Sequence, residues 1–245
     1  MCTNDARRHS PARRAVMLGI PALLVAGCAG SQWRPVSAAR GFTEAGPDGQ
    51  GRESAYTRRA REHMRRNLPN ILLYTQDGKP VRFYDDLVKD RVVLINFMYT
   101  QCTGKCPPTT RALVKIQEQL ADRVGTDILI LSITLDPEVD TPEVLKAYAD
   151  DFGAGPGWVY LTGQFDEIDE LRHKLGVFDP DPILDADRTN HAGILTFGNE
   201  RTGRWAALPA LMETDEIVKA VLRITREPRR RGDRALAASR SRSRS

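Results

Sequence analysis

Residues 92–110 read VVLINFMYTQCTGKCPPTT, and this stretch decides the fold class. Its first seven residues are almost continuously apolar, which is typical of a central strand that is covered on both faces. Two cysteines, Cys102 and Cys106, come shortly after the strand, and a pair of prolines follows the second one. The stretch therefore predicts a buried strand, a dithiol turn and the start of a helix.

The dithiol can hold a soft metal, exchange disulfides, or do both. Pro107 and Pro108 keep the second cysteine out of a helix interior, so at least one sulfur is expected on the turn before the helix. The positive helix N-terminus and Lys105 both favour the thiolate form there. Three residues separate the cysteines, one more than in thioredoxin-type redox motifs. This wider loop lets both sulfurs face one metal and still allows a disulfide to close.

Strand and helix patterns alternate along most of the chain. Thr141-Pro142-Glu143 marks a helix start, with an N-cap, a proline at the first helical position and an acid in the first turn. Strands are predicted at 71–74, 81–84, 92–98, 127–133, 158–161, 192–197 and 204–208, and helices at 109–124, 141–152, 164–175 and 214–225. This order predicts an α/β, thioredoxin-like three-layer sandwich with an N-terminal β-hairpin extension and an inserted hairpin near the C-terminus.

The N-terminus is typical of an export signal. Four arginines within residues 7–14 precede an apolar run at 15–27, which is too short to span a bilayer comfortably. The run ends in VAGC, which resembles a bacterial lipobox whose cysteine, here Cys28, is lipidated and begins the mature protein. The alternatives are a short anchoring helix or a plain signal peptide. All three place the folded part outside the cytoplasm, where Cys2 is discarded and disulfides persist.

Composition divides the chain into four segments. We expect a lipoprotein-type signal at 1–27, a flexible tether at 28–67, a folded domain at 68–226 and a disordered Arg/Ser-rich tail at 227–245. Within the tether, the sequence at 55–66 is compatible with one or two helical turns. The net charge of +4 comes from the two basic ends, because the domain between them is acidic. For an exported tail we expect a solvated segment first and contact with anionic lipids second, and we expect no nucleic acid partner.

Two sulfurs are an incomplete metal site. Soft thiolates select Cu(I) and Zn, and imidazole suits copper in either oxidation state, so a histidine is expected as a further ligand. Of the four histidines, His9 lies in the signal, His63 in the tether and His173 on a helix flank. His191 follows a polar loop and directly precedes a strand that should start at the same sheet edge as the dithiol. It is the candidate third ligand. An ordinary hydrogen-bonding role at a strand edge is the alternative.

Three segments in order, VVLINFMYTQCTGKCPPTT, SITLDPEVDTPEVLKAYADDFG and NHAGILTF, resemble the SCO/SenC copper-chaperone family over about residues 68–226. The resemblance implies a thioredoxin-like fold and one copper, Cu(I) or Cu(II), bound by Cys102, Cys106 and His191. It implies that Asp136 lies near the site as a second-shell group. It further implies delivery of copper to, or reduction of cysteines in, the binuclear copper centre of a respiratory enzyme such as cytochrome c oxidase. Oxidation of the two thiols to a disulfide would remove two ligands, which couples copper carriage to redox state.

The chain departs from the family pattern in two places. Asn190 precedes the histidine where much of the family has an aspartate, so a carboxylate that would orient the ring is absent. A lipobox at Cys28 also replaces the more usual membrane helix, which predicts a protein held at the bacterial membrane and facing the periplasm or cell exterior.

A metallochaperone is the expected function, and two enzyme functions remain as alternatives. A thiol-disulfide reductase would need only Cys102 and Cys106. A peroxide-reducing enzyme is less favoured, because Tyr99 stands where the threonine of a peroxidatic Thr-x-x-Cys motif would be.

Overall fold

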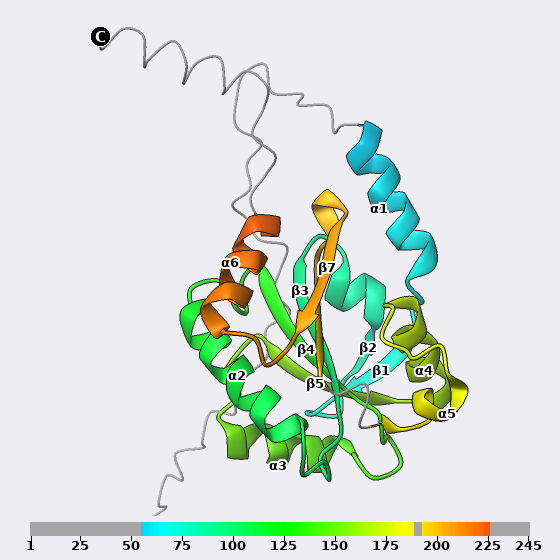
Figure 1. Cartoon of the computed structure of the whole chain (residues 1–245), viewed down its shortest axis with the longest axis vertical. Helices are drawn as coiled ribbons and strands as arrows, with labels where there is room; N and C mark the ends of the chain where they lie inside the picture. The colour runs from blue at the N-terminus through cyan, green and yellow to red at the C-terminus, as the bar shows by residue number, and fades with distance from the viewer. Residues whose placement is uncertain (1–54, 189–192, 226–245) are drawn as a thin grey trace, which may run out of the picture. The chain divides into compact units, whose positions relative to one another are not determined.

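A computed structural model describes residues 55–188 and 193–225. Seven strands form one sheet in the order β2-β1-β5-β4-β3-β6-β7 (Figure 1). The strands are β1 (Leu72–Thr75), β2 (Pro80–Arg82), β3 (Val92–Met98), β4 (Ile128–Thr134), β5 (Trp158–Gly163), β6 (Ile194–Asn199) and β7 (Arg204–Pro209). The longer helices are α1 (Ala55–Asn67), α2 (Cys106–Gln119), α3 (Pro142–Phe152), α4 (Phe165–Lys174) and α6 (Thr214–Thr225).

Strand β3 lies near the middle of the sheet because the side chains on both of its faces are mostly apolar and need to be covered. All seven of its residues are buried, and so are all seven of β4. Strands β3, β4 and β5 are parallel neighbours, whereas β6 pairs antiparallel with β3. The carboxyl ends of β3 and β4 and the start of β6 therefore meet at one edge of the sheet, which we call the dithiol edge because Cys102 follows β3 there.

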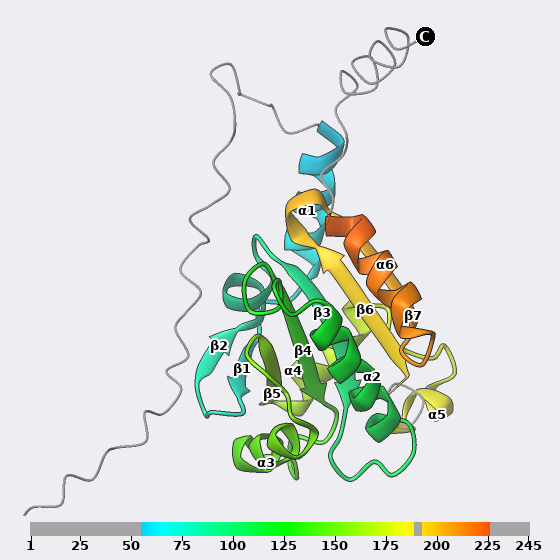
Figure 2. The same cartoon turned by 90° about the vertical axis from the view of Figure 1, so that its left-hand side faces the viewer.

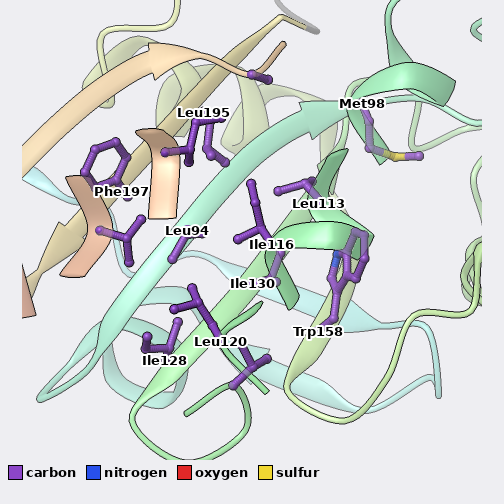
Figure 3. Close-up of a cluster of buried hydrophobic side chains, with 14 of the residues drawn as sticks. Leu94, Met98, Leu113, Ile116, Leu120, Ile128, Ile130, Trp158, Leu195 and Phe197 are labelled. Carbon is purple, nitrogen blue, oxygen red and sulfur yellow. The ribbon is translucent and has the colours of Figure 1, made fainter. Parts of the chain in front are cut away.

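Helices cover both faces of the sheet, which confirms the expected three layers (Figures 1 and 2). Under α2, α3 and α6 lies one apolar cluster, of which Leu94, Ile116, Ile130 and Trp158 are members (Figure 3). A second cluster on the other face joins the sheet to α4 and to a short π-helix, η1 (Phe83–Val88). Both expected hairpins, β1–β2 and β6–β7, are present.

Two helix starts show how far local signals reach. The N-cap prediction for α3 is confirmed, since the backbone N–H of Val144 donates to the Thr141 hydroxyl and Gly153 ends the helix in the left-handed conformation. Helix α2 begins at Cys106, three residues before the expected position. Prolines are tolerated in its first turn because backbone N–H groups there have no partner within the helix.

The strand predicted at 81–84 was too long. Strand β2 ends at Arg82, and Phe83 and Tyr84 open η1 instead. The Asn70 side-chain oxygen accepts the backbone N–H groups of Tyr84 and Asp85, and both aromatic rings are buried. A side chain 14 residues away thus helps to end the strand. The hydrophobic periodicity of residues 81–84 does not indicate this contact.

Part of the stretch expected to be a tether is helical, since α1 occupies Ala55–Asn67. A four-residue helix, α5 (Pro182–Asp185), lies in the loop expected before His191. Within the described ranges, no helix combines the length and apolar character needed to cross a membrane. The expected signal, Cys28, the tail and His191 lie outside the described residues.

Shortening a buried side chain of the central strand should destabilise the fold. Leu94 is fully buried in β3, so Leu94→Ala is expected to lower the free energy of unfolding by about 2–5 kcal/mol. The matched change Leu211→Ala removes the same atoms from a side chain that is 55% exposed, and its effect should stay within about 0.5 kcal/mol. Denaturant unfolding of both variants measures this. Equal losses would show that β3 is not the packed centre of the sheet.

Candidate metal and redox site

The two cysteines lie at the dithiol edge, Cys102 in the turn that joins β3 to α2 and Cys106 at the start of α2. Cys102 lies on the turn, and its backbone N–H donates to the Tyr99 carbonyl at 3.2 Å. Cys106 is the first residue of α2, and its N–H donates to the Cys102 sulfur at 3.4 Å. Residues 103–105 are exposed, but both cysteine side chains are buried and both are free thiols. The turn is thus open to solvent while its sulfurs face inward.

Cys102 is the more readily ionised thiol. Burial raises its pKa, but hydrogen bonds from the Cys106 thiol, from the backbone N–H groups of Cys106 and Gly104, and from the Tyr99 hydroxyl outweigh burial. The net result is a pKa below the ordinary thiol value. Because the thiolate is both the nucleophile and the metal ligand, Cys102 is the sulfur that is ready to react.

Cys106 keeps its proton more strongly. Burial, the hydrogen bond with Cys102 and the charges of Cys102 and Asp140 raise its pKa to about 12. Burial and the hydrogen bond to Cys102 likewise raise the pKa of Tyr99 to about 12. In the metal-free pair Cys102 therefore loses its proton before Cys106, and this order suits disulfide exchange. A bound metal would displace the second proton.

The buried carboxylate of Asp140 anchors the turn through hydrogen bonds. The backbone N–H of Thr100 donates to it at 3.1 Å, and the hydroxyls of Thr100 and Thr134 also donate to it. Asp140 is 0% exposed and belongs to the loop after β4, whereas Thr100 belongs to the loop after β3. The carboxylate thus joins the two loops that form the dithiol edge.

Asp136, expected as a second-shell residue, lies in the same β4–α3 loop. Its side chain is 15% exposed, and the Arg188 guanidinium donates to it at 2.7 Å. Its backbone N–H donates to the Thr134 hydroxyl at 2.9 Å. The contact that the structure shows for its carboxylate is therefore with the loop that leads toward residue 191.

His191 lies outside the described residues, but residues on both sides of it are described. Arg188 contacts Asp136 at the dithiol edge. A side chain on Gly193 would meet the Lys105 side chain at 3.6 Å, so Gly193 lies beside the dithiol turn. In the described ranges, no group of three or more His, Cys, Asp or Glu side chains is arranged to hold a metal ion.

Helix α4 holds the loop that carries Arg188. Arg172 is buried and binds Asp185 through both terminal nitrogens, at 2.7 and 2.9 Å. It also donates to the Val177 carbonyl at 2.8 Å. His173, expected on a helix flank, is 41% exposed, stacks on Phe178 and lies 3.2 Å from the Asp185 carboxylate. These contacts give the loop a fixed path away from α4.

Three residues of this site, Asp140, Arg188 and Tyr99, were not predicted from the sequence as parts of it. Asp140 stands four residues after Asp136 in the same LDPEVDTP segment, and its position directly before the α3 N-cap was the available signal. Arg188 carried no signal, since its pairing with Asp136 joins residues 52 positions apart.

A protein-family model described as SCO1/SenC matches residues 68–226. A Stutzerimonas stutzeri protein named for copper binding is 30% identical over 132 residues, which cover 53% of this chain and 63% of that protein. The chain matches 51–63% of the length of the first three curated relatives.

Two solved structures share the fold. The SCO1/SenC family lipoprotein of Bacillus anthracis is 23% identical, with a TM-score of 0.53 over 65% of this chain and 95% of that one. BsSco, a member of the Sco family of cytochrome c oxidase assembly proteins in which a disulfide switch is described, is 28% identical, with a TM-score of 0.50 over 63% and 90%.

The two thiols should react at different rates. In the reduced, metal-free protein, iodoacetamide is expected to alkylate Cys102 first, with a midpoint in the rate-versus-pH curve below the ordinary thiol pKa. Tyr99→Phe removes a hydrogen bond to the thiolate, so it should move that midpoint upward. Mass mapping of the alkylated peptides measures both effects.

Tyr148→Phe is the matched control, because the Tyr148 hydroxyl pairs with Thr110 at 3.1 Å and not with a cysteine. Its midpoint should equal that of the unmodified protein. Equal reaction of Cys102 and Cys106 at neutral pH would contradict the asymmetry.

Proposed function

The chain belongs to the SCO1/SenC family, and on this premise we propose that it is an exported, membrane-anchored copper-binding chaperone. Its proposed role is to deliver copper to a respiratory binuclear copper centre such as that of cytochrome c oxidase, or to prepare the cysteines of that centre. The observation that carries the proposal is the Cys102–Cys106 pair, whose sulfurs hydrogen-bond to one another at the end of the central strand.

The donor chemistry fits copper. Two thiolates are soft ligands that select Cu(I), and an added imidazole suits copper in either oxidation state. The relative named for copper binding supports this choice. Copper is cargo in this account, so the site must also release it, and a site with few ligands at a protein edge is suited to release.

We propose His191 as the third ligand. Arg188, three residues before it, contacts Asp136 at the dithiol edge, and Gly193, two residues after it, lies beside Lys105. Two peptide links limit the Cα distance between His191 and Gly193 to about 7 Å. The covalent chain therefore limits how far His191 can lie from the dithiol turn, and this limit supports its proposed role as a ligand.

In this proposal Asp136 acts through the loop. Its ion pair with Arg188 joins the β4–α3 loop to the segment that continues into Asn190 and His191. Because the carboxylate that much of the family has before the histidine is an asparagine here, a loop held by Asp136 offers another way to limit where the histidine lies.

A thiol-disulfide reductase is the second candidate, and the lowered pKa of Cys102 favours it specifically. The Cys102 thiolate would attack a partner's disulfide, forming a mixed disulfide and releasing one partner thiolate. Cys106 would then displace the second partner sulfur, so that the partner gains two thiols and this protein is left with a Cys102–Cys106 disulfide. The disulfide switch described for BsSco supports this chemistry in a related protein.

Copper titration separates the two functions. The reduced protein is expected to bind one equivalent of Cu(I) under anaerobic conditions, and Cys102→Ser should abolish tight binding. His191→Ala should weaken Cu(II) binding by more than about 100-fold, because removing a ligand costs at least as much as removing its supporting group. His173→Ala is the matched control and should bind copper like the unmodified protein.

Reduction of a test disulfide is measured on the same samples. If the unmodified protein binds no copper but reduces the disulfide readily, and His191→Ala does so equally well, the reductase replaces the chaperone as the proposed function.

Lipidation is tested by changing each N-terminal cysteine. In a bacterial host, Cys28→Ser should remove the acyl mass and shift the protein out of the membrane fraction, because the lipidated cysteine would be lost. Cys2→Ser should change neither, since the signal would be removed. A Cys28→Ser protein that stays fully in the membrane fraction would point instead to an uncleaved N-terminal helix.

A further inference from the structure

Helix α1 carries an unusual concentration of positive charge. Its 13 residues include five arginines and one glutamate. Ala60, Arg61 and Met64 lie on the partly buried side, whereas Arg58, Arg59 and four further polar or aromatic side chains lie outward, namely Tyr56, His63, Arg65 and Arg66. The helix therefore presents a basic outer face, defined here by Arg58, Arg59, Arg65 and Arg66.

Specific contacts hold α1 against the domain. Arg61 lies 3.4 Å from the carboxylates of both Glu200 and Asp90. Glu200 is 1% exposed and also accepts the Tyr84 hydroxyl at 2.9 Å, so the anchor point is part of the core. Gly203 has a φ of 65° and lies so close to Ala60 that a side chain there would come within 2.5 Å of it. The basic outer face is thus fixed in orientation relative to the sheet.

The positive charge of this face exceeds the negative charge that pairs with it in the described residues. Arg65 and Arg66 share one partner, Glu62, and no ion pair of Arg58 or Arg59 occurs within the part of the chain that the structure describes. Residues 68–225 hold 25 acidic and 16 basic residues, so the domain itself is acidic. An anionic surface would therefore repel most of the domain and attract α1.

The position of α1 in the fold determines which end of the domain would face an anionic surface. It packs on η3 (Glu200–Thr202), which directly follows β6. Strand β6 pairs Asn199 with Val92 at the start of β3 and Leu195 with Asn96 near its end. Helix α1 therefore lies at the edge of the sheet opposite the dithiol edge, as Figure 2 shows by the direction of β6. The seven residues of β3 separate the two edges by about 20 Å.

We propose that the basic outer face of α1 binds the anionic headgroups of a bilayer and so points the dithiol edge away from the membrane. Clustered arginines on a helix are attracted to anionic lipid headgroups, and the exposed Tyr56 ring suits the interface. Residues 29–54 separate Cys28 from α1, so a lipid anchor at Cys28 would keep the helix near the membrane surface. The inference rests on the proposed anchored location and does not depend on copper binding.

Vesicle sedimentation tests the proposal on residues 29–245, the expected mature chain without Cys28, so that neither an acyl group nor the apolar run at 15–27 contributes. Binding to vesicles of equal parts phosphatidylglycerol and phosphatidylcholine is expected, and salt should weaken it. The triple variant Arg58→Gln, Arg59→Gln, Arg66→Gln should bind about 100-fold more weakly, from the contribution of each arginine near a charged surface. Glutamine keeps the helix propensity, so α1 should still form.

The matched control removes three exposed charges from α2 and α6 by Arg111→Gln, Lys115→Gln and Lys219→Gln, and its binding should change by less than about threefold. A second control, Arg240→Gln, Arg242→Gln and Arg244→Gln, measures how much the tail contributes to vesicle binding. The proposal is overturned if the unmodified chain does not bind, if the α1 variant binds like it, or if the α2/α6 variant loses as much.

The orientation of the dithiol edge relative to the membrane is measured on the same samples. Alkylation of Cys102 by a membrane-impermeant maleimide should proceed at the same rate with and without vesicles, and protection by vesicles would contradict the orientation. Copper titration of the α1 variant should be unchanged, so that failure of membrane binding and failure of the chaperone function are told apart.

Discussion

The buried carboxylate of Asp140 is the constraint on which the site depends. Strands β3 and β4 are parallel, so their following loops leave the sheet at the same edge, but parallel pairing alone does not fix those loops. Asp140 does so by accepting three donors from Thr100 and Thr134. Burying a carboxylate is costly unless its acceptor capacity is used, and here the donors come from the loop after β3 and from the last residue of β4. The turn that carries Cys102 is therefore tied to the loop that carries Asp136, and through the Asp136–Arg188 pair to the segment before His191.

The unequal thiols link this architecture to chemistry. Cys102 is held as the more acidic sulfur by donors from the turn and the helix start, while burial keeps the proton on Cys106. A thiolate beside a thiol can attack a disulfide, and the same two sulfurs can take a soft metal when the second proton leaves. In the proposed function, copper carriage and thiol exchange would therefore use one pair of atoms and would exclude each other at any moment. This competition explains why the proposed function must be tested with both reactions on one sample.

Much of the fold could be predicted because its signals are local. The apolar run of β3, the Thr141 N-cap and the stop at Gly153 each lie within the element that they define. The dithiol could be predicted for the same reason. Contacts between distant residues could not: Asn70 ends β2 early, Asp140 joins two loops, and Arg188 reaches Asp136. The docking of α1 was missed because it depends on Glu200 and Gly203, which lie about 140 residues later. Composition alone made that segment resemble a tether.

The central claim is that two cysteines and one histidine share a copper ion. X-ray absorption at the copper edge of the reduced, copper-loaded protein tests it most directly, because the first shell reports the ligand atoms themselves. The account predicts two sulfur atoms and one imidazole nitrogen, with the nitrogen lost in His191→Ala, retained in His173→Ala, and both sulfurs retained in each. A shell without two sulfurs, or a nitrogen that persists in His191→Ala, would contradict it.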